Sequence, residues 1–140
     1  PVLPDGDDRD ERLLLWASRC VTTRQVHLAE ALLDEVVVAP PGQQWRMHAL
    51  RGMVHTVRGE RALALRTFRQ LEEGGAPARG VADARVTAAW LTDDPELAVA
   101  LVGDQRSVAA ARVLYEVGAV DEARLATPAG TTFASVIGTE

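Results

Sequence analysis

The stretch of sequence that decides the fold runs from Met47 to Leu71 and reads MHALRGMVHTVRGERALALRTFRQL. Apolar residues recur at steps of three and four on both sides of Gly59, which is the spacing of an amphipathic helix. The first run predicts a helix over residues 43–58, and the second predicts a helix that starts at Glu60. Glycine disfavours helix interiors and favours the turn after a helix. We therefore expect two antiparallel helices joined by a tight turn at Gly59.

The same helical pattern extends over most of the 140 residues, without the sustained alternation of a strand. It predicts an all-α fold of about 7–8 helices, with a polar lead-in over residues 1–10, a helical repeat domain over residues 11–128 and a C-terminal helix or docked tail over residues 129–140. The other helices are expected from Arg12 to about Val21, Val26 to Val36, Val81 to Leu91, Pro95 to Val102, Gln105 to Val117 and Val120 to Ala126.

Small residues recur twelve positions apart in several of the expected helix pairs, as at Gly52 and Ala64. A large apolar residue follows four positions later, as at Phe68. Small residues let two helix backbones approach closely, and a large side chain fills the space beside them. The residues that we expect to pack the hairpins together are Ala17, Ala29, Leu33, Gly52, Gly59, Ala64, Phe68, Ala98, Ala111, Gly118 and Ala123.

On these residues the chain resembles the tetratricopeptide repeat family over about residues 10–126, and Gly52, Gly59, Ala64 and Phe68 form the best copy. The family repeats a helical pair about every 34 residues. The resemblance implies stacked antiparallel hairpins in a short right-handed superhelix. The chain departs from the family pattern at Arg24, where a turn glycine is expected. A different stack or bundle of helical pairs is the alternative architecture.

The resemblance also implies a concave groove lined by the first helix of each pair. Carried over by register, its lining is Leu14, Ser18, Val21, Ala49, Met53, Thr56, Asp83, Thr87, Trp90, Arg112 and Tyr115. Such domains bind a peptide, a helix or a partner domain, so we expect a protein–protein interaction module. For Met53 and Trp90 taken singly, core packing is the favoured interpretation. The hairpins, rich in Arg, Ala and Leu, are also similar to the helical sensor segments of large bacterial transcription activators. This similarity would make the chain the regulatory part of such a protein.

Two other functions remain open at this point. Self-association into a dimer would use an exposed terminal helix, with Phe133 to Ile137 as the candidate contact. A small-molecule sensor would line a pocket with Trp90 and Tyr115.

Several functions are disfavoured by what the sequence lacks. There is no lysine and no asparagine, which excludes a Schiff-base lysine and a P-loop lysine. No nucleophile-elbow or dinucleotide-binding motif is present, so we expect neither an enzyme nor a cofactor. The single cysteine, Cys20, rules out an internal disulfide and favours a reducing compartment. With no leader-like or membrane-length apolar segment, we expect a cytoplasmic protein that does not contact a membrane.

The charged residues are interpreted mainly as a solvated surface. Arginines gather at positions 46, 51, 58, 61, 66 and 69, inside a chain of net charge −5. We expect them to pair with acidic neighbours such as Glu30 and Asp34, and not to bind nucleic acid directly. His48, Arg51 and His55 share one side of a helix, but the two histidines lie about 10 Å apart, too far for one metal ion. We therefore expect no metal site.

Overall fold

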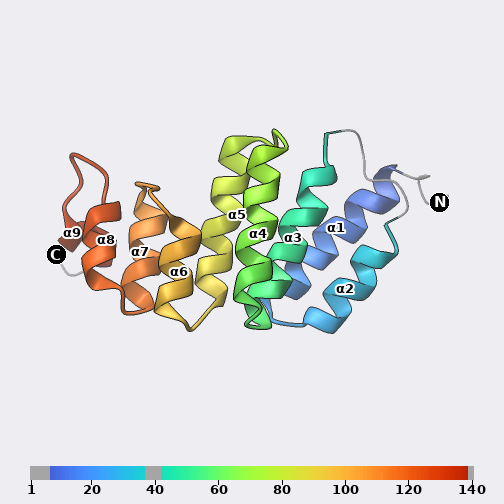
Figure 1. The fold of residues 1–140 in the computed structure, drawn as a ribbon, viewed down its shortest axis with the longest axis horizontal. Coiled ribbons are helices and arrows are strands. Elements are labelled where there is room, and N and C mark those ends of the chain that lie inside the picture. The colour runs from blue at the N-terminus through green and yellow to red at the C-terminus, as the bar shows by residue number, and fades with distance from the viewer. Residues whose placement is uncertain (1–6, 37–41, 139–140) are drawn as a thin grey trace. The chain divides into compact units, whose positions relative to one another are not determined.

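The computed structural model describes residues 7–36 and 42–138, and these residues form an all-α fold, as the sequence predicts (Figure 1). The described ranges contain nine helices and no strand. The helices are α1 (Asp7–Thr22), α2 (Val26–Asp34), α3 (Gln44–Val57), α4 (Arg61–Glu73), α5 (Ala78–Leu91), α6 (Pro95–Val102), α7 (Val108–Glu116), α8 (Val120–Ala126) and α9 (Phe133–Ile137). The ninth helix settles the tail, which the sequence left open between helix, strand and docked segment.

The chain divides into two compact units, and the division falls inside α5. The first unit is Pro1–Val81 and the second is Ala82–Glu140. Each unit has its own buried core. Leu14, Leu33 and Phe68 are fully buried in the first unit, and Leu97, Leu101 and Leu114 are fully buried in the second.

Three helical pairs, α1–α2, α3–α4 and α7–α8, are joined by turns of the same geometry. Each connection has three residues, and the middle one has a positive φ of 64° at Arg24, 77° at Gly59 and 96° at Gly118. The residue after it donates its backbone N–H to the carbonyl five positions back. These bonds are Gln25 to Cys20 (2.7 Å), Glu60 to His55 (2.8 Å) and Ala119 to Leu114 (2.8 Å). This is the Schellman ending of a helix, and it sends the chain back along the helix it has left.

The α5–α6 connection uses different chemistry. The side chain of Asp94 accepts a hydrogen bond from the backbone N–H of Glu96 at 3.0 Å, and Pro95 takes the first helical position. Two long-range bonds hold the residues of α5 that belong to the second unit against the end of α6. Arg85 Nη1 donates to the carbonyl of Leu101 at 3.3 Å, and Gln105 Nε2 donates to the carbonyl of Ala82 at 3.3 Å.

Some helix ends differ from the sequence-based bounds. Helix α1 begins at Asp7, so residues 7–10 of the expected lead-in are helical. Helix α7 begins at Val108 and not at Gln105, because Ser107 caps it by accepting a bond from the N–H of Ala110 at 3.0 Å. Helix α5 begins at Ala78, three residues earlier than expected. Residues 1–6 of the lead-in and 139–140 of the tail lie outside the described residues.

The small residues of the repeat lie where helices cross closely. Gly52 is buried in α3, and a Cβ atom added to it would lie 3.0 Å from two ring carbons of Phe68 on α4. The alanines among the expected packing residues are fully buried in both units, at Ala17, Ala29, Ala64, Ala98, Ala111 and Ala123. Gly59 and Gly118, which were also expected to pack the hairpins together, are exposed in turns. The ring of Phe68 therefore lies directly on the α3 backbone, and this contact holds the α3–α4 hairpin together.

Replacing Gly52 with Ala is expected to destabilise the fold. Overpacking of a core destabilises a fold by about 1–3 kcal/mol. Alanine in place of glycine stabilises the helix by about 1 kcal/mol, because its helix propensity is higher. Because Phe68 is fully buried, its ring would have to shift by a few tenths of an ångström inside the core, so we expect a net loss of about 1 kcal/mol in the free energy of unfolding, measured by urea denaturation. Adding Phe68→Leu to the Gly52→Ala variant should show a favourable coupling in a double-mutant cycle. Strict additivity of the two changes would contradict the contact.

Replacing Arg24 with Gly is expected to stabilise the fold. A left-handed conformation costs a residue with a side chain about 1–2 kcal/mol, and the greater freedom of glycine in the unfolded chain takes back about 0.4–1 kcal/mol. We expect a net gain of about 0.5–1 kcal/mol, read as a higher urea midpoint. The converse change at the equivalent turn, Gly59→Ala, should lower the midpoint. A lower midpoint for Arg24→Gly would show that this turn is not strained.

Candidate functional site

The predicted groove residues of the first unit are mostly core residues. Leu14, Val21, Ala49, Met53 and Thr56 are all buried, and Thr56 donates its hydroxyl to the carbonyl of Gly52 at 2.9 Å. These five residues cannot contact a partner while the fold is intact, so the structure removes them from the predicted groove. Helix α1 packs against both α2 and α3, and this packing buries the α1 residues of the set. Ser18, also on α1, is half-buried.

The predicted groove residues of the second unit are at its surface. Asp83, Thr87 and Trp90 follow the i, i+4, i+7 spacing along α5, and we call them the α5 stripe. Asp83 is exposed, Thr87 is half-buried, and Trp90 has 54% of its surface exposed. Trp90 is thus not a core residue, in contrast to Met53, which is. A tryptophan that the fold leaves half in water is a candidate anchor for a partner.

The same arrangement recurs twenty-five residues later on α7. Val108, Arg112 and Tyr115 have the same i, i+4, i+7 spacing, and we call them the α7 stripe. Arg112 is exposed, and Val108 and Tyr115 have 47% and 37% of their surface exposed. Sequence reasoning missed Val108. The signal was present, because the step from Ala98 to Ala123 is also twenty-five residues.

The polar groups of the two stripes are only lightly engaged within the chain. Thr87 donates its hydroxyl to the carbonyl of Asp83 at 3.0 Å, within α5. Arg112 Nε lies 3.8 Å from a carboxylate oxygen of Glu116, one helical turn away. An exposed pair at this distance is worth about 0–1 kcal/mol, so the guanidinium can exchange it for a partner group. The stripes thus offer two aromatic rings and an arginine, residue types that are enriched at interfaces, together with one acid.

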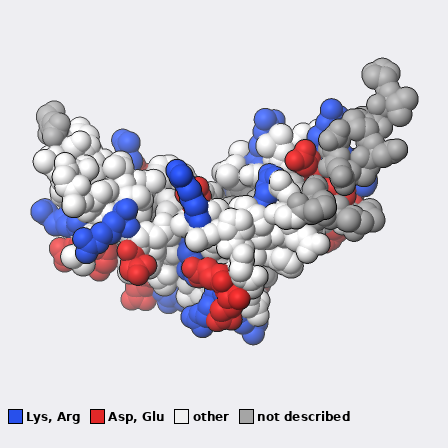
Figure 2. All heavy atoms as spheres, turned by 90° about the horizontal axis from the view of Figure 1, so that it is seen from above, with Lys and Arg blue, Asp and Glu red and all other residues white. Residues whose placement is uncertain are grey.

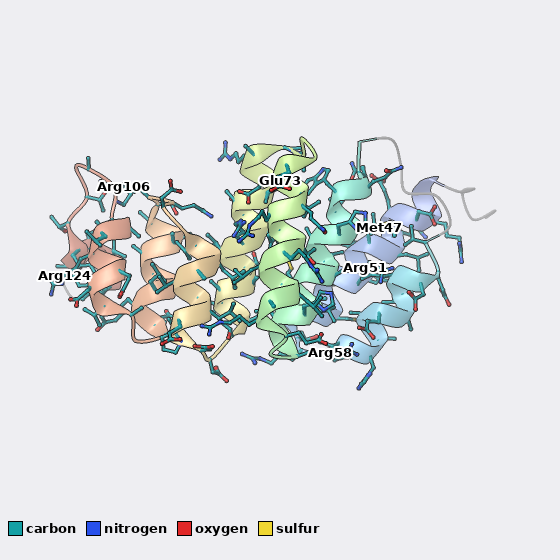
Figure 3. All side chains as sticks on the ribbon, viewed as in Figure 1. Met47, Arg51, Arg58, Glu73, Arg106 and Arg124 are labelled. Carbon is teal, nitrogen blue, oxygen red and sulfur yellow. The ribbon has the colours of Figure 1, made fainter. Side chains whose placement is uncertain are left out.

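Tyr115 also takes part in a cluster at the C-terminal end of the second unit. Its ring meets that of Phe133 edge to face, with centroids 5.8 Å apart and planes at 77°. The guanidinium carbon of Arg124 lies 4.6 Å from the centre of the same Phe133 ring. Figure 3 labels Arg124 on α8, at the end of the unit that α9 occupies. Phe133 is therefore held between α7 and α8.

This cluster changes the expectation for Phe133 to Ile137 as an exposed contact between copies. Val136 has only 2% of its surface exposed, and Phe133 and Ile137 are half-buried. These apolar residues are used to pack α9 against its own unit, which leaves little of their surface for a second copy.

Arg51 and Arg58, two of the clustered arginines of the first unit, pair with acids of α2. Arg58 Nη1 lies 2.6 Å from a carboxylate oxygen of Glu30, and Arg51 Nη2 lies 3.5 Å from one of Asp34. Arg51 lies on α3 and Arg58 directly follows that helix, and Figure 3 labels both. On the face shown in Figure 2, basic and acidic side chains are interspersed, without one extended basic area.

The histidines and the cysteine do not assemble a reactive site. His55 Nδ1 lies 2.9 Å from a carboxylate oxygen of Glu60, and His48 is exposed. Cys20 is a half-buried free thiol. In the part of the chain that the structure describes, no group of three or more His, Cys, Asp and Glu residues could hold a metal ion.

Two clefts lie away from the stripes. One of about 370 Å³ is lined by Val99, Leu114, Glu122 and Leu125 among others, and one of about 550 Å³ is lined by Trp45, His48, Gly74 and Pro77 among others. Neither Trp90 nor Tyr115 lines either of them. These clefts give no support to the small-molecule pocket that the sequence analysis placed at those two residues.

Comparisons with protein-family models, with curated proteins and with solved structures find no match for this chain. No helix within residues 7–36 and 42–138 combines the length and the apolar character that crossing a bilayer requires.

The two sets of predicted groove residues should respond differently to truncation. Met53→Ala should lower the free energy of unfolding by about 2–4 kcal/mol, because it leaves a cavity in the core. Trp90→Ala should change it by less than about 1 kcal/mol, because the indole is half in water. Urea denaturation of both variants measures the contrast. Equal destabilisation by the two changes would show that Trp90 is a packing residue after all.

Proposed function

We propose that this chain is a protein–protein interaction module that binds a partner protein through the α5 and α7 stripes of its second unit. The observation that carries the proposal is the exposure of Trp90 and Tyr115 at equivalent positions of two first helices. Large rings that stay partly in water after folding are the rigid anchors that interfaces use.

The charges beside the rings support the same proposal. Asp83 and Arg112 each lie one or two helical turns from an exposed ring, and both are at the surface. Opposite charges on the two stripes would fix the register of a partner more than its affinity. The tetratricopeptide resemblance agrees with this role and adds the prior that the partner is a peptide, a helix or a domain. We extend the proposal to the regulatory part of a larger bacterial protein, such as a transcriptional regulator, on the resemblance alone.

The experiment is capture of partners from a lysate of the source cell by immobilised wild-type chain, followed by mass spectrometry and titration of the purified partner. Trp90→Ala should weaken binding about 30-fold or more, the effect of removing an interface anchor worth at least about 2 kcal/mol. Arg112→Glu should weaken it further by reversing a charge of the α7 stripe.

The matched control is Leu28→Ala, which removes an apolar side chain that is 49% exposed but belongs to the first unit. It should leave binding unchanged. Capture of the same proteins by wild type and Trp90→Ala would refute the proposed site. Loss of binding in Leu28→Ala alone would move the site to the first unit.

A further inference from the structure

Helix α9 is a short helix with its own start and stop signals. Thr132 caps its beginning by accepting a hydrogen bond from the N–H of Ser135 at 3.1 Å. Gly138, with a φ of 76°, ends it in the left-handed conformation. Only six residues, from Thr127 to Thr132, connect α8 to α9. The segment is thus a defined helical element on a short connection.

The contacts of α9 are made by one face. Phe133, Val136 and Ile137 have the i, i+3, i+4 spacing of an amphipathic helix that lies in a groove. Phe133 packs between Tyr115 and Arg124, and Val136 is buried. The other residues of the helix, Ala134 and Ser135, are exposed. The α7–α8 pair therefore already binds an amphipathic helix, which its own chain supplies.

The docking of α9 on its own unit is weak because the helix is short. A helix of five residues is far below the length at which helices persist alone, so α9 depends on its docking. One buried valine and two half-buried apolar residues make up its apolar contact. Elements with so few buried contacts open at low cost compared with global unfolding.

Helix α9 also leaves part of the neighbouring surface uncovered. Val120 lies one turn before Arg124 on α8, so both point to the same side of that helix. Arg124 contacts Phe133 of α9, whereas Val120 has 38% of its surface exposed. A longer amphipathic helix on the same site would cover Val120 as well. A second copy of this chain would supply only the same five-residue helix, which would leave Val120 uncovered again.

We infer that the α7–α8 surface beneath α9 is a binding site for an amphipathic helix of a partner protein, with an aromatic residue in the place of Phe133, and that α9 is the internal occupant that this helix displaces. The inference rests on the proposed function and names the class of partner. It assigns Tyr115 and Arg124 as the two side chains that receive the aromatic ring.

The test uses the full chain and a fluorescently labelled peptide of residues 131–138, TTFASVIG, in anisotropy titrations up to 1 mM peptide. Phe133→Ala and Val136→Asp each remove an apolar contact of α9 and should release it, and neither changes a residue of α7 or α8. Both variants should bind the peptide at least tenfold more tightly than wild type. Ser135→Ala is the matched control, since it changes an exposed residue of the same helix, and it should behave as wild type.

Two further variants test the receiving side chains. Tyr115→Ala, added to Phe133→Ala, should weaken peptide binding at least fivefold. A peptide with alanine in place of its phenylalanine should not bind. Circular dichroism of every variant shows whether the helical fold is retained, and having two independent release variants keeps the test open if one of them unfolds.

Absence of peptide binding by folded release variants would overturn the inference. So would a wild-type dimer, seen by light scattering, that Phe133→Ala dissolves, because it would show that copies exchange α9. The proposed function fails separately, through unchanged capture in Trp90→Ala. Trp90→Ala should leave peptide binding in the release variants intact, so the two failures are distinguishable.

Discussion

The close approach of two helix backbones, permitted by small residues and filled by one large ring, is the constraint on which each hairpin depends. At Gly52 an additional carbon atom would lie only 3.0 Å from the ring of Phe68, so the ring would have to shift to admit it. The alanines expected to pack the other pairs are fully buried. Since dispersion contacts fall off steeply with distance, a wider spacing would forfeit much of the packing energy of each pair.

The bounds of some helices could be predicted from capping and turn residues in the sequence. The bounds of α6 and α8 agree with the sequence-based ones, because Asp94 with Pro95 marks the start of α6 and Gly118 separates α8 from α7. The start of α7 was placed three residues early, because the expected bounds passed over Ser107, the residue that caps the helix. The hairpin contact at Gly52 was also indicated by the sequence, because a small residue and a large ring stand at the spacing of two packed helices.

The candidate site was only half predictable, for a different physical reason. Val21 and Trp90 each end an i, i+4, i+7 set of expected groove residues, yet Val21 is fully buried and Trp90 is half exposed. Whether such a position is buried depends on which other elements pack against its helix. The spacing of residues within the helix does not carry that information. The tail shows the same limit. Phe133 to Ile137 reads as an apolar surface in the sequence, and only the packing of Phe133 between Tyr115 and Arg124 shows where that surface is used.

The division between the two units inside α5 has a consequence for how the chain folds. Only Ala78 to Val81, about one turn, belong to the first unit, and they include Gly80, whose backbone lies against the indole of Trp45. One turn cannot sustain itself as a helix, because initiation fixes several residues for a single hydrogen bond. We therefore expect a cut at the boundary to weaken the contact beneath Trp45, because the turn from Ala78 to Val81 would lose the remainder of its helix.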